Sequence, residues 1–279
     1  GRRCRRLCRV CGRTFSATTG TPYHRMRRPK RDLDLAVRLQ AEGTTKAGIG
    51  RAVGAHPSTV GRWLERTGRH ARAFQDAHLR LAEGDRPHEF QCDELSCKGT
   101  GAAENAWAFN GIEVWTRLWT ALRVGNRTLR NTTLFVRQLA AAVGPRMWPF
   151  LVTSDGFKYY EEVMRRVLGK TRCVYVQVEN RYGRRGIVRS DYRQILGTPQ
   201  ALEWVMERSE DSKVPNTSFV ERINLRSRMS CSFLRRRNPA PARKPEKIEQ
   251  ALELVRLIYN FVQPHGSLRF GSECRTPAV

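Results

Sequence analysis

Residues 89–95 read EFQCDEL, in which apolar and polar side chains alternate around one acid, Asp93. Alternation with a period of two predicts a half-buried β-strand. Two more segments with strand character follow at 106–113 and 117–124, with a short turn between them. Together the three segments predict an antiparallel meander, and the acid in its first strand is the first candidate for chemistry.

Downstream of the meander, helical and strand patterns alternate. The expected elements are a helix at 129–143, a buried strand at 148–153, a helix at 157–168, a strand at 173–178, an irregular basic insert at 179–215, and helices at 217–229 and 246–261. The order β-β-β-α-β-α-β-α is that of the ribonuclease-H-like fold. We therefore expect an α/β catalytic domain of ribonuclease-H-like type over residues 88–279, ending in a C-terminal helix.

Three acids stand at distinct places in this order. Asp93 lies in the first strand, Asp155 at the end of the fourth, and Glu221 on the helix at 217–229. Neighbouring central strands would bring the two aspartates side by side, and a helix packed on the sheet would add the glutamate. Clustered carboxylates repel one another unless divalent cations lie between them, and oxygen ligands favour Mg²⁺ or Mn²⁺. We expect all three to be catalytic metal ligands. Two ions about 3.5–4 Å apart would activate a water or a 3′-hydroxyl and stabilise the leaving oxygen of a phosphodiester.

Each acid also has a purely structural interpretation. Asp155 precedes Gly156 and fits a turn, while Glu221 completes a capping box that begins at Ser218. Asp93 is followed by Glu94, and a period of two lets only one of this pair face a given side of the sheet. The three acids taken together, in this element order, favour the catalytic interpretation.

The charge balance favours a polyanionic partner. Lys and Arg number 51 against 26 Asp and Glu, which gives a net charge of +25 and a pI of about 10.9. Arginine accounts for 43 of these cations and lysine for 8. Arginine binds phosphate bidentately and stacks on bases, so we expect double-stranded DNA rather than an acidic protein or a membrane surface.

The sequence argues against a membrane-inserted protein and against a disulfide-stabilised one. The longest apolar run has six residues, Met147 to Val152, against the roughly 20 that span a bilayer, so no membrane insertion is expected. The eight cysteines are scattered, which is typical of thiols in a reducing compartment rather than of a disulfide framework. We expect a cytoplasmic, nucleoid-associated protein.

Residues 31–70 predict a DNA-binding domain built from short helices. The helices are expected at 32–42, 44–53 and 58–66. The last two are joined by a tight glycine-containing turn and resemble a helix-turn-helix, whose second helix, capped by Ser58, would enter a major groove. The side chains that would face DNA are Ser58, Thr59, Arg62 and Arg66. The alternative is a plain helical bundle. A helical linker is expected at 71–87.

The segment 1–30 carries half of a zinc site. Cys8 and Cys11 form a CxxC followed by glycine, a turn that points two thiolates at one ion. A structural zinc site needs four ligands, so this interpretation expects a second CxxC upstream of the present sequence. The alternative is a pair of unligated thiols in an arginine-rich tail.

Further basic and polar residues are candidates for phosphate contact. Asn224 and Arg228 follow Glu221 by three and seven residues and share its helix face, with Arg222 beside them. Farther on, the run Arg235, Arg236 and Arg237 would track a DNA backbone. The alternative for this run is a solvated charged surface.

These motifs, in this order, resemble those of the IS1-type DDE transposases of bacterial and archaeal insertion sequences. The likeness covers nearly the whole chain. It rests on CRVCGRTF at 8–15, the helix-turn-helix, QCDEL at 91–95, SDGF at 154–157, NTSFVER at 216–222 and YNFVQPH at 259–265. The last two are the most specific. The chain departs from the family at Ser96 and Cys97, where such proteins usually carry an aromatic residue.

The resemblance implies cleavage and strand transfer at transposon ends by a DDE triad that maps onto Asp93, Asp155 and Glu221. It also implies binding to terminal repeats and target DNA by a homodimer or a larger oligomer. Two other functions stay open at this stage. One is a DNA-binding regulator or inactive relic that occupies transposon ends without cutting, and the other is a structure-specific nuclease of the same fold.

Overall fold

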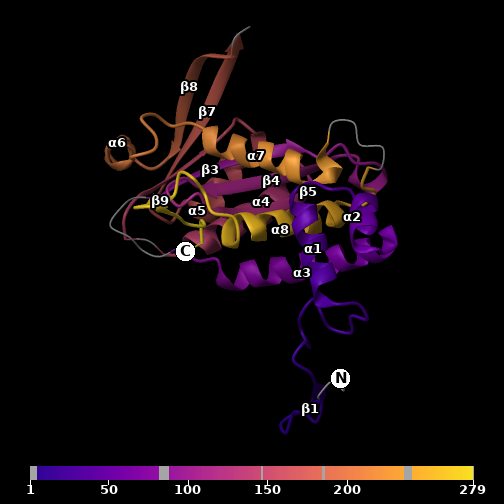
Figure 1. Cartoon of the computed structure of the whole chain (residues 1–279). Helices are drawn as coiled ribbons and strands as arrows, with labels where there is room; N and C mark the ends of the chain where they lie inside the picture. The colour runs from indigo at the N-terminus through magenta and orange to yellow at the C-terminus, as the bar shows by residue number, and fades with distance from the viewer. Residues whose placement is uncertain (1–4, 82–87, 146, 184–185, 236–240, 279) are drawn as a thin grey trace.

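A mixed β-sheet forms the centre of the molecule in the computed structural model, which describes residues 5–81, 88–145, 147–183, 186–235 and 241–278 (Figure 1). Within these residues the sheet has six strands in the order β5-β4-β3-β6-β7-β8. Their bounds are β3 Glu89–Ser96, β4 Ala106–Glu113, β5 Trp119–Asn126, β6 Phe150–Ser154, β7 Cys173–Gly183 and β8 Gly186–Leu196. Strands β5, β4 and β3 are antiparallel neighbours, β3, β6 and β7 are parallel, and β8 runs antiparallel to β7.

Helices cover both faces of this sheet. Helices α4 (Leu129–Val143) and α5 (Lys158–Leu168) pack on one face, and α7 (Ser218–Ser230) and α8 (Pro245–Phe261) pack on the other. A shorter helix, α6 (Pro199–Arg208), contacts β6 and β7 on the α7 side. Alternation along β3 separates the two cores as expected, because Phe90 and Cys92 face α4 and α5 while Leu95 faces α7 and α8. The expected α/β class is therefore confirmed.

Three helices precede the sheet and pack against α8. They are α1 (Lys30–Ala41), α2 (Lys46–Val53) and α3 (Pro57–His78). Their core, built around Leu33, Ile49 and Val60, includes Leu254 of α8. Arg72 of α3 also donates to Glu249 of α8 at 2.7 Å. In Figure 1, α3 runs beneath α8, and the segment before α1 extends away from the body. That segment holds the hairpin β1 (Arg6–Leu7) and β2 (Thr14–Phe15).

Several sequence-based expectations about elements are wrong. The third N-terminal helix continues to His78 instead of ending at Arg66. It starts at Pro57, and the cap is His56, whose ring accepts from the Ser58 backbone N–H. Proline is favoured at the first helical position because that residue needs no N–H partner, which moves the cap two residues upstream of Ser58.

The insert expected to be irregular, 179–215, is also different. β7 continues to Gly183, β8 returns alongside it, and α6 follows. Along β8, Tyr192 and Arg193 are exposed, so this edge strand lacks the apolar alternation by which strands are recognised. Two short hairpin strands near the C-terminus, β9 (Arg269–Phe270) and β10 (Glu273–Cys274), were not expected either. Short 3₁₀ turns occur at Gly101–Ala103 and Ser232–Leu234.

The outer edge of β5 is sealed by side chains from the helices. Asn260 accepts from the Trp119 N–H at 3.0 Å, and Gln138 accepts from the Leu122 N–H at 3.0 Å. Arg256 donates to the Trp119 carbonyl at 2.8 Å and to the Thr120 carbonyl at 2.6 Å. An unpaired strand edge invites pairing with another chain, so these contacts close a potential aggregation site. In the part of the chain described here, no helix is long and apolar enough to cross a membrane.

Candidate active site

The pairing of β3 with β6 brings two of the expected acids together. The strands are parallel and Cys92 lies opposite Ser154, so Asp93 and Asp155 follow at the same level of neighbouring strands. Glu221 lies in the first turn of α7, the helix that runs along the sheet above β3 and β4 in Figure 1. All three line one cavity of about 350 Å³, together with Glu179 of β7. The structure thus brings together the three acids named from the sequence.

Glu179 is the member of this cavity that sequence reasoning missed. The strand was expected to end at Val178, one residue earlier, and the glutamate was assigned to the irregular insert. A signal was available, because the alternation of Val176, Gln177 and Val178 continues into Glu179. β6 and β7 are parallel neighbours paired through Ser154 and Gln177, which places Glu179 at the same end of the sheet as Asp155.

The structural alternatives for Asp155 and Glu221 have different outcomes. Asp155 does make a turn contact, because its Oδ1 accepts from the Phe157 N–H at 3.1 Å, but the side chain also lines the cavity. The capping box is wrong. Ser218 is the first residue inside α7 rather than its cap, and its N–H donates to Asn216 Oδ1 at 3.0 Å. Glu221 is exposed, so its carboxylate is available to a ligand in the cavity.

The alternation of β3 separates Asp93 from Glu94. Asp93 faces α7, where Asn224 donates to its Oδ2 at 2.6 Å. Glu94 lies on the opposite face, buried against α5, and accepts from Arg127 at 2.8 Å. The Arg127 guanidinium also stacks 4.0 Å from the centroid of the Phe157 ring. Asp93 is therefore the acid of this pair that belongs to the cavity.

Burial and mutual repulsion act on these carboxyls. Burial raises the pKa of Asp93 to about 6, and the negative charges of Asp155 and Glu221 add to the rise. Hydrogen bonds from the Glu94 N–H and from Asn224 oppose it. Burial also raises the pKa of Asp155, against the Phe157 N–H and the charge of Arg127. A divalent cation would favour the ionised form of both groups.

The donor set fits a hard cation that is held by few protein ligands. In the described residues, no group of three or more His, Cys, Asp or Glu side chains is close enough, as they stand, to hold a metal ion. Mg²⁺ is usually bound by one or two carboxylates, several waters and substrate phosphates, so it does not need such a group. An oxygen-only cavity with carboxylates on separate elements matches that mode of binding.

The other residues expected at this site have mixed positions. Arg222 and Arg228 are exposed on α7, as phosphate contact requires. Asn224 is buried, and it accepts from Asn110 at 2.7 Å while it donates to Asp93, so it orients the carboxylate rather than a phosphate. Arg235 donates to the Gly43 carbonyl at 2.7 Å and so joins this segment to the N-terminal helices. Arg236 and Arg237 lie outside the described residues.

The expected DNA-facing residues of α3 are likewise divided. Ser58 and Arg62 are exposed near its start, and Arg62 donates to the Thr59 hydroxyl at 3.3 Å. Arg66 turns toward the N-terminal segment, where it donates to the His24 carbonyl at 2.9 Å. The structure therefore leaves the first turns of α3 open to a partner, whereas Arg66 holds the N-terminal segment.

The expected zinc half-site lies in the β1–β2 hairpin. Cys8 accepts from the backbone N–H groups of Cys11 and Val10, and these contacts lower the pKa of its thiol. Gly12 takes a positive φ of 66°, which lets the turn close behind the two sulfurs. The described residues supply two thiols here and no third Cys, His, Asp or Glu to complete a site.

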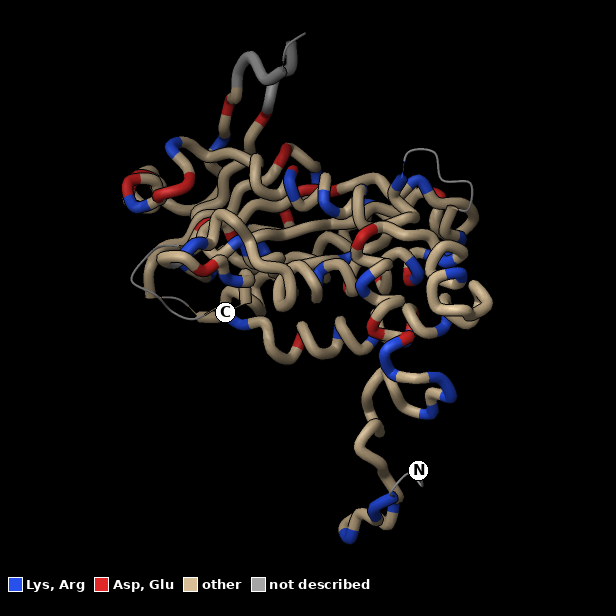
Figure 2. The backbone as a smooth tube through the Cα atoms, in the orientation of Figure 1, with Lys and Arg blue, Asp and Glu red and all other residues tan. Residues whose placement is uncertain are grey.

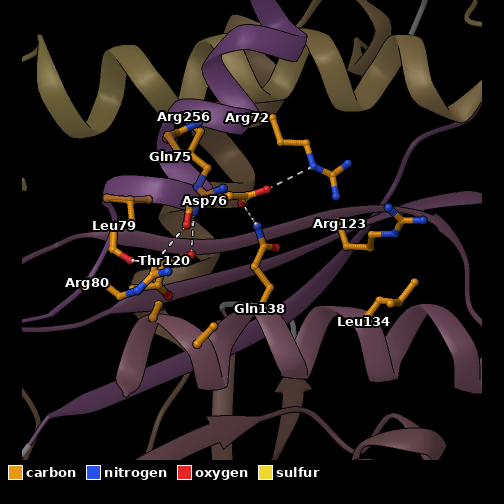
Figure 3. Close-up of a pocket in the computed structure, with 12 residues that line it drawn as sticks. Arg72, Gln75, Asp76, Leu79, Arg80, Thr120, Arg123, Leu134, Gln138 and Arg256 are labelled. Atoms are coloured by element: carbon orange, nitrogen blue, oxygen red, sulfur yellow. Dashed lines mark hydrogen bonds and ion pairs between the residues drawn. The ribbon is translucent and has the colours of Figure 1, made fainter. Parts of the chain in front are cut away.

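A second hollow, of about 230 Å³, lies between α3, α4 and β5 (Figure 3). Four arginines line it, but three of them are in ion pairs. Arg72 and Arg123 bind Glu249, and Arg256 binds Glu253. The fourth, Arg80, donates to the backbone carbonyls of Asp76 and Leu79. We assign this hollow to the structure of the α3–α8 contact.

No family model matches the chain, and no curated protein matches its sequence.

Proposed function

We propose that this protein is a metal-dependent DNA transposase that cleaves phosphodiesters at the ends of a mobile element and joins them to target DNA. The observation that carries the proposal is the convergence of Asp93, Asp155 and Glu221, from three separate elements, on one cavity in a strongly basic chain. This is the pattern that the resemblance to IS1-type DDE transposases implies.

We also propose that residues 88–279 form a ribonuclease-H-like domain, and the order of strands in the sheet supports this. Three antiparallel strands lead into β6 and β7, which run parallel to β3, with helices on both faces. A ribonuclease-H-like domain has this order, and it carries acids on its first and fourth strands. Asp93 on β3 and Asp155 after β6 occupy those two places.

The chemistry follows from what the cavity can hold. Asp93, Asp155 and Glu221 would hold Mg²⁺ or Mn²⁺, with Glu179 lining the same cavity. Such ions supply an activated oxygen nucleophile and stabilise charge on the leaving oxygen. In cleavage, a water oxygen bonds to phosphorus and the 3′-oxygen leaves. In joining, that 3′-hydroxyl bonds to a target phosphorus, and the target's own 3′-oxygen leaves.

DNA contact is proposed for the N-terminal part of the chain. Residues 5–31 contain no Asp or Glu, and Figure 2 shows Lys and Arg along this segment. Ser58 and Arg62 at the exposed start of α3 would enter a major groove. Arg222 and Arg228 would contact phosphate beside the acids. We further propose that zinc on Cys8 and Cys11, completed by ligands outside the described residues, stiffens the hairpin, and that the protein acts as a homodimer or larger oligomer.

The deciding experiment is strand transfer of a pre-cut donor oligonucleotide into plasmid DNA with Mg²⁺ or Mn²⁺. Wild type should yield joined product, whereas Asp155→Asn should yield none and still bind DNA. Asp76→Asn is the matched control, because Asp76 is a half-exposed aspartate on α3, outside the acidic cavity. It should join as wild type does.

Three other outcomes would contradict the proposal. Full metal-dependent activity in Asp155→Asn would show that the acids were misassigned. Nicking without joining would indicate a nuclease. DNA binding that weakens with salt, with neither nicking nor joining, would indicate a regulator or an inactive relic.

A further inference from the structure

The side chain of Gln91 connects the strand that carries Asp93 to the helix that carries Glu221. It is fully buried on β3, two residues before Asp93 and therefore on the same face of the sheet. Its Oε1 accepts from the Phe219 N–H at 2.8 Å and from the Val220 N–H at 3.2 Å. These are backbone donors of the first turn of α7, which have no partner within the helix.

Gln91 therefore caps α7 from a distant strand. Helices are usually capped by the residue that precedes them, but the Thr217 side chain makes no such bond here. The amide nitrogen of Gln91 also donates to Asn216 Oδ1 at 3.0 Å, the same atom that accepts from the Ser218 N–H. One side chain thus fixes both the first turn of α7 and the loop that enters it.

A second contact runs in the opposite direction, from helix to strand. Asn224 lies three residues after Glu221 and donates to Asp93 at 2.6 Å. Behind it, Asn110 of β4, which pairs with Asp93 across the sheet, donates to Asn224 at 2.7 Å. The two contacts reach α7 on either side of Glu221, so the position of this glutamate relative to Asp93 is set from both sides.

The residue type fits this task. An aspartate or glutamate would accept the same two N–H groups, but it would place another negative charge two residues from Asp93. The neutral amide accepts without that charge, and its nitrogen binds Asn216 at the same time. Glutamine at position 91 is therefore suited to a helix cap that must stand next to an acidic cavity.

We propose that Gln91 is a positioning residue that holds Glu221 at the distance from Asp93 needed for both to bind the same metal centre. This inference rests on the proposed function of the acidic cavity. Partners behind metal ligands typically change metal affinity by 10- to 100-fold when they are removed. The effect of losing the cap should therefore appear in the metal dependence and not only in stability.

The test compares Gln91→Met with Gln75→Met in the full chain. Methionine has a similar size and cannot accept these N–H bonds. Gln75 is also fully buried and hydrogen bonded, to Glu253 at 2.8 Å, but it lies in the α3–α8 contact. The readouts are the Mn²⁺ concentration that gives half-maximal strand transfer, Mn²⁺ affinity by calorimetry without DNA, and thermal unfolding.

Gln91→Met should raise the half-maximal Mn²⁺ concentration and the calorimetric dissociation constant by about 10-fold or more. Binding of DNA without metal should stay unchanged. Gln75→Met should leave the half-maximal Mn²⁺ concentration and the dissociation constant within about twofold of wild type. This should hold even if Gln75→Met lowers the unfolding temperature as much as Gln91→Met does. Wild-type metal values in folded Gln91→Met would overturn the inference.

A second variant covers the case in which Gln91→Met does not fold. Thr153 of β6 donates to the Asn216 carbonyl at 2.7 Å, so Thr153→Val loosens the same loop at nearly constant volume. It should raise the Mn²⁺ requirement several-fold, and unchanged values would overturn the inference. A wild type that binds Mn²⁺ without joining DNA would contradict the proposed function alone, because calorimetry on the variants would still test Gln91. A wild type that binds no Mn²⁺ would overturn both.

Discussion

Carboxylates behind β5 and carboxylates in the acidic cavity have different surroundings in this molecule. Behind β5, Glu249 binds Arg72 at 2.7 Å and Arg123 at 3.3 Å, and Glu253 binds Arg256 at 3.2 Å. In the acidic cavity, by contrast, no ion pair reaches Asp93, Asp155 or Glu221 within the described residues. The first group is neutralised by arginines of the protein itself, whereas the second has no such counter-ion among the described residues.

This difference separates a structural role from a chemical one. A buried carboxylate that is ion-paired and hydrogen bonded joins neighbouring helices and strands, and removing its partner strongly destabilises the protein. Carboxylates that repel one another in a cavity destabilise the folded protein, and such clusters are typical of sites that bind a ligand or carry out a reaction. The sequence contains glutamates in both places, so the same substitution can be made in each.

The largest expected contrast comes from Glu221→Gln and Glu253→Gln. Glu221→Gln should lower strand transfer by roughly 10⁴-fold, on the order of losing one member of a catalytic triad. Its unfolding temperature should be unchanged or higher, because one repelling charge is gone. Glu253→Gln should retain wild-type joining once its stability is allowed for. Joining rates and thermal unfolding of both variants measure this, and equal losses of joining would erase the distinction between the two regions.

The acidic cavity could be predicted from the sequence because it depends on neighbouring elements. The β3 alternation, the α4 and α5 periodicities and the short apolar run of β6 are all local patterns, and the structure confirms them. Once β3 and β6 are taken as parallel neighbours, Asp93 and Asp155 must lie together. Strand order therefore predicts the two aspartates of the cavity, whereas Glu221 comes from α7 and Glu179 from a strand that extends past its expected end.

What could not be predicted depends on contacts between distant residues. Gln91 accepts a hydrogen bond from the Phe219 N–H, which is 128 residues away in the sequence. The residues next to Gln91 in the sequence do not indicate that it caps a helix. Glu253 and Arg256 are on one helix turn, but their partners on α3 and β5 are far away in sequence. The β8 strand was missed for another reason, since an exposed edge strand needs no apolar alternation.

Removing one partner from the ion pairs behind β5 should destabilise the protein. Arg256→Met would leave Glu253 buried without its counter-ion and would remove the hydrogen bonds that Arg256 donates to the Trp119 and Thr120 carbonyls. We expect the free energy of unfolding to fall by about 3–5 kcal/mol, as for other broken buried pairs. Urea denaturation measures it, with exposed Arg62→Met as the control, expected within about 0.5 kcal/mol of wild type. A loss no greater than that of the control would show that the pair behind β5 contributes little.

The unpaired region should instead gain stability from added cations. At a concentration about 100 times the dissociation constant, a ligand that binds only the folded state adds about 2.7 kcal/mol. Mg²⁺ or Mn²⁺ should therefore raise the free energy of unfolding of wild type, because it neutralises the acids of the cavity. Asp155→Asn should lose most of this gain, and Arg256→Met should keep it. An equal gain in all three proteins would place the cation elsewhere.

The smallest expected effect is a difference in pH dependence. Burial raises the pKa of Glu253 from 4.5 to about 7, against the attraction of Arg256. Between these two values the folded protein keeps a proton that the unfolded chain has released, so this group's contribution to stability falls as the pH rises. One such proton changes the free energy of unfolding by at most about 1.4 kcal/mol per pH unit. Glu253→Gln should remove this slope, so its stability relative to wild type should rise between pH 5 and pH 7. Urea unfolding across this range measures the difference in free energy of unfolding between the two proteins. The titration of Asp93 and Glu94 cancels in this difference, because both proteins contain these residues. Parallel curves would mean that Glu253 stays ionised in the folded protein over this pH range, held by its ion pair with Arg256.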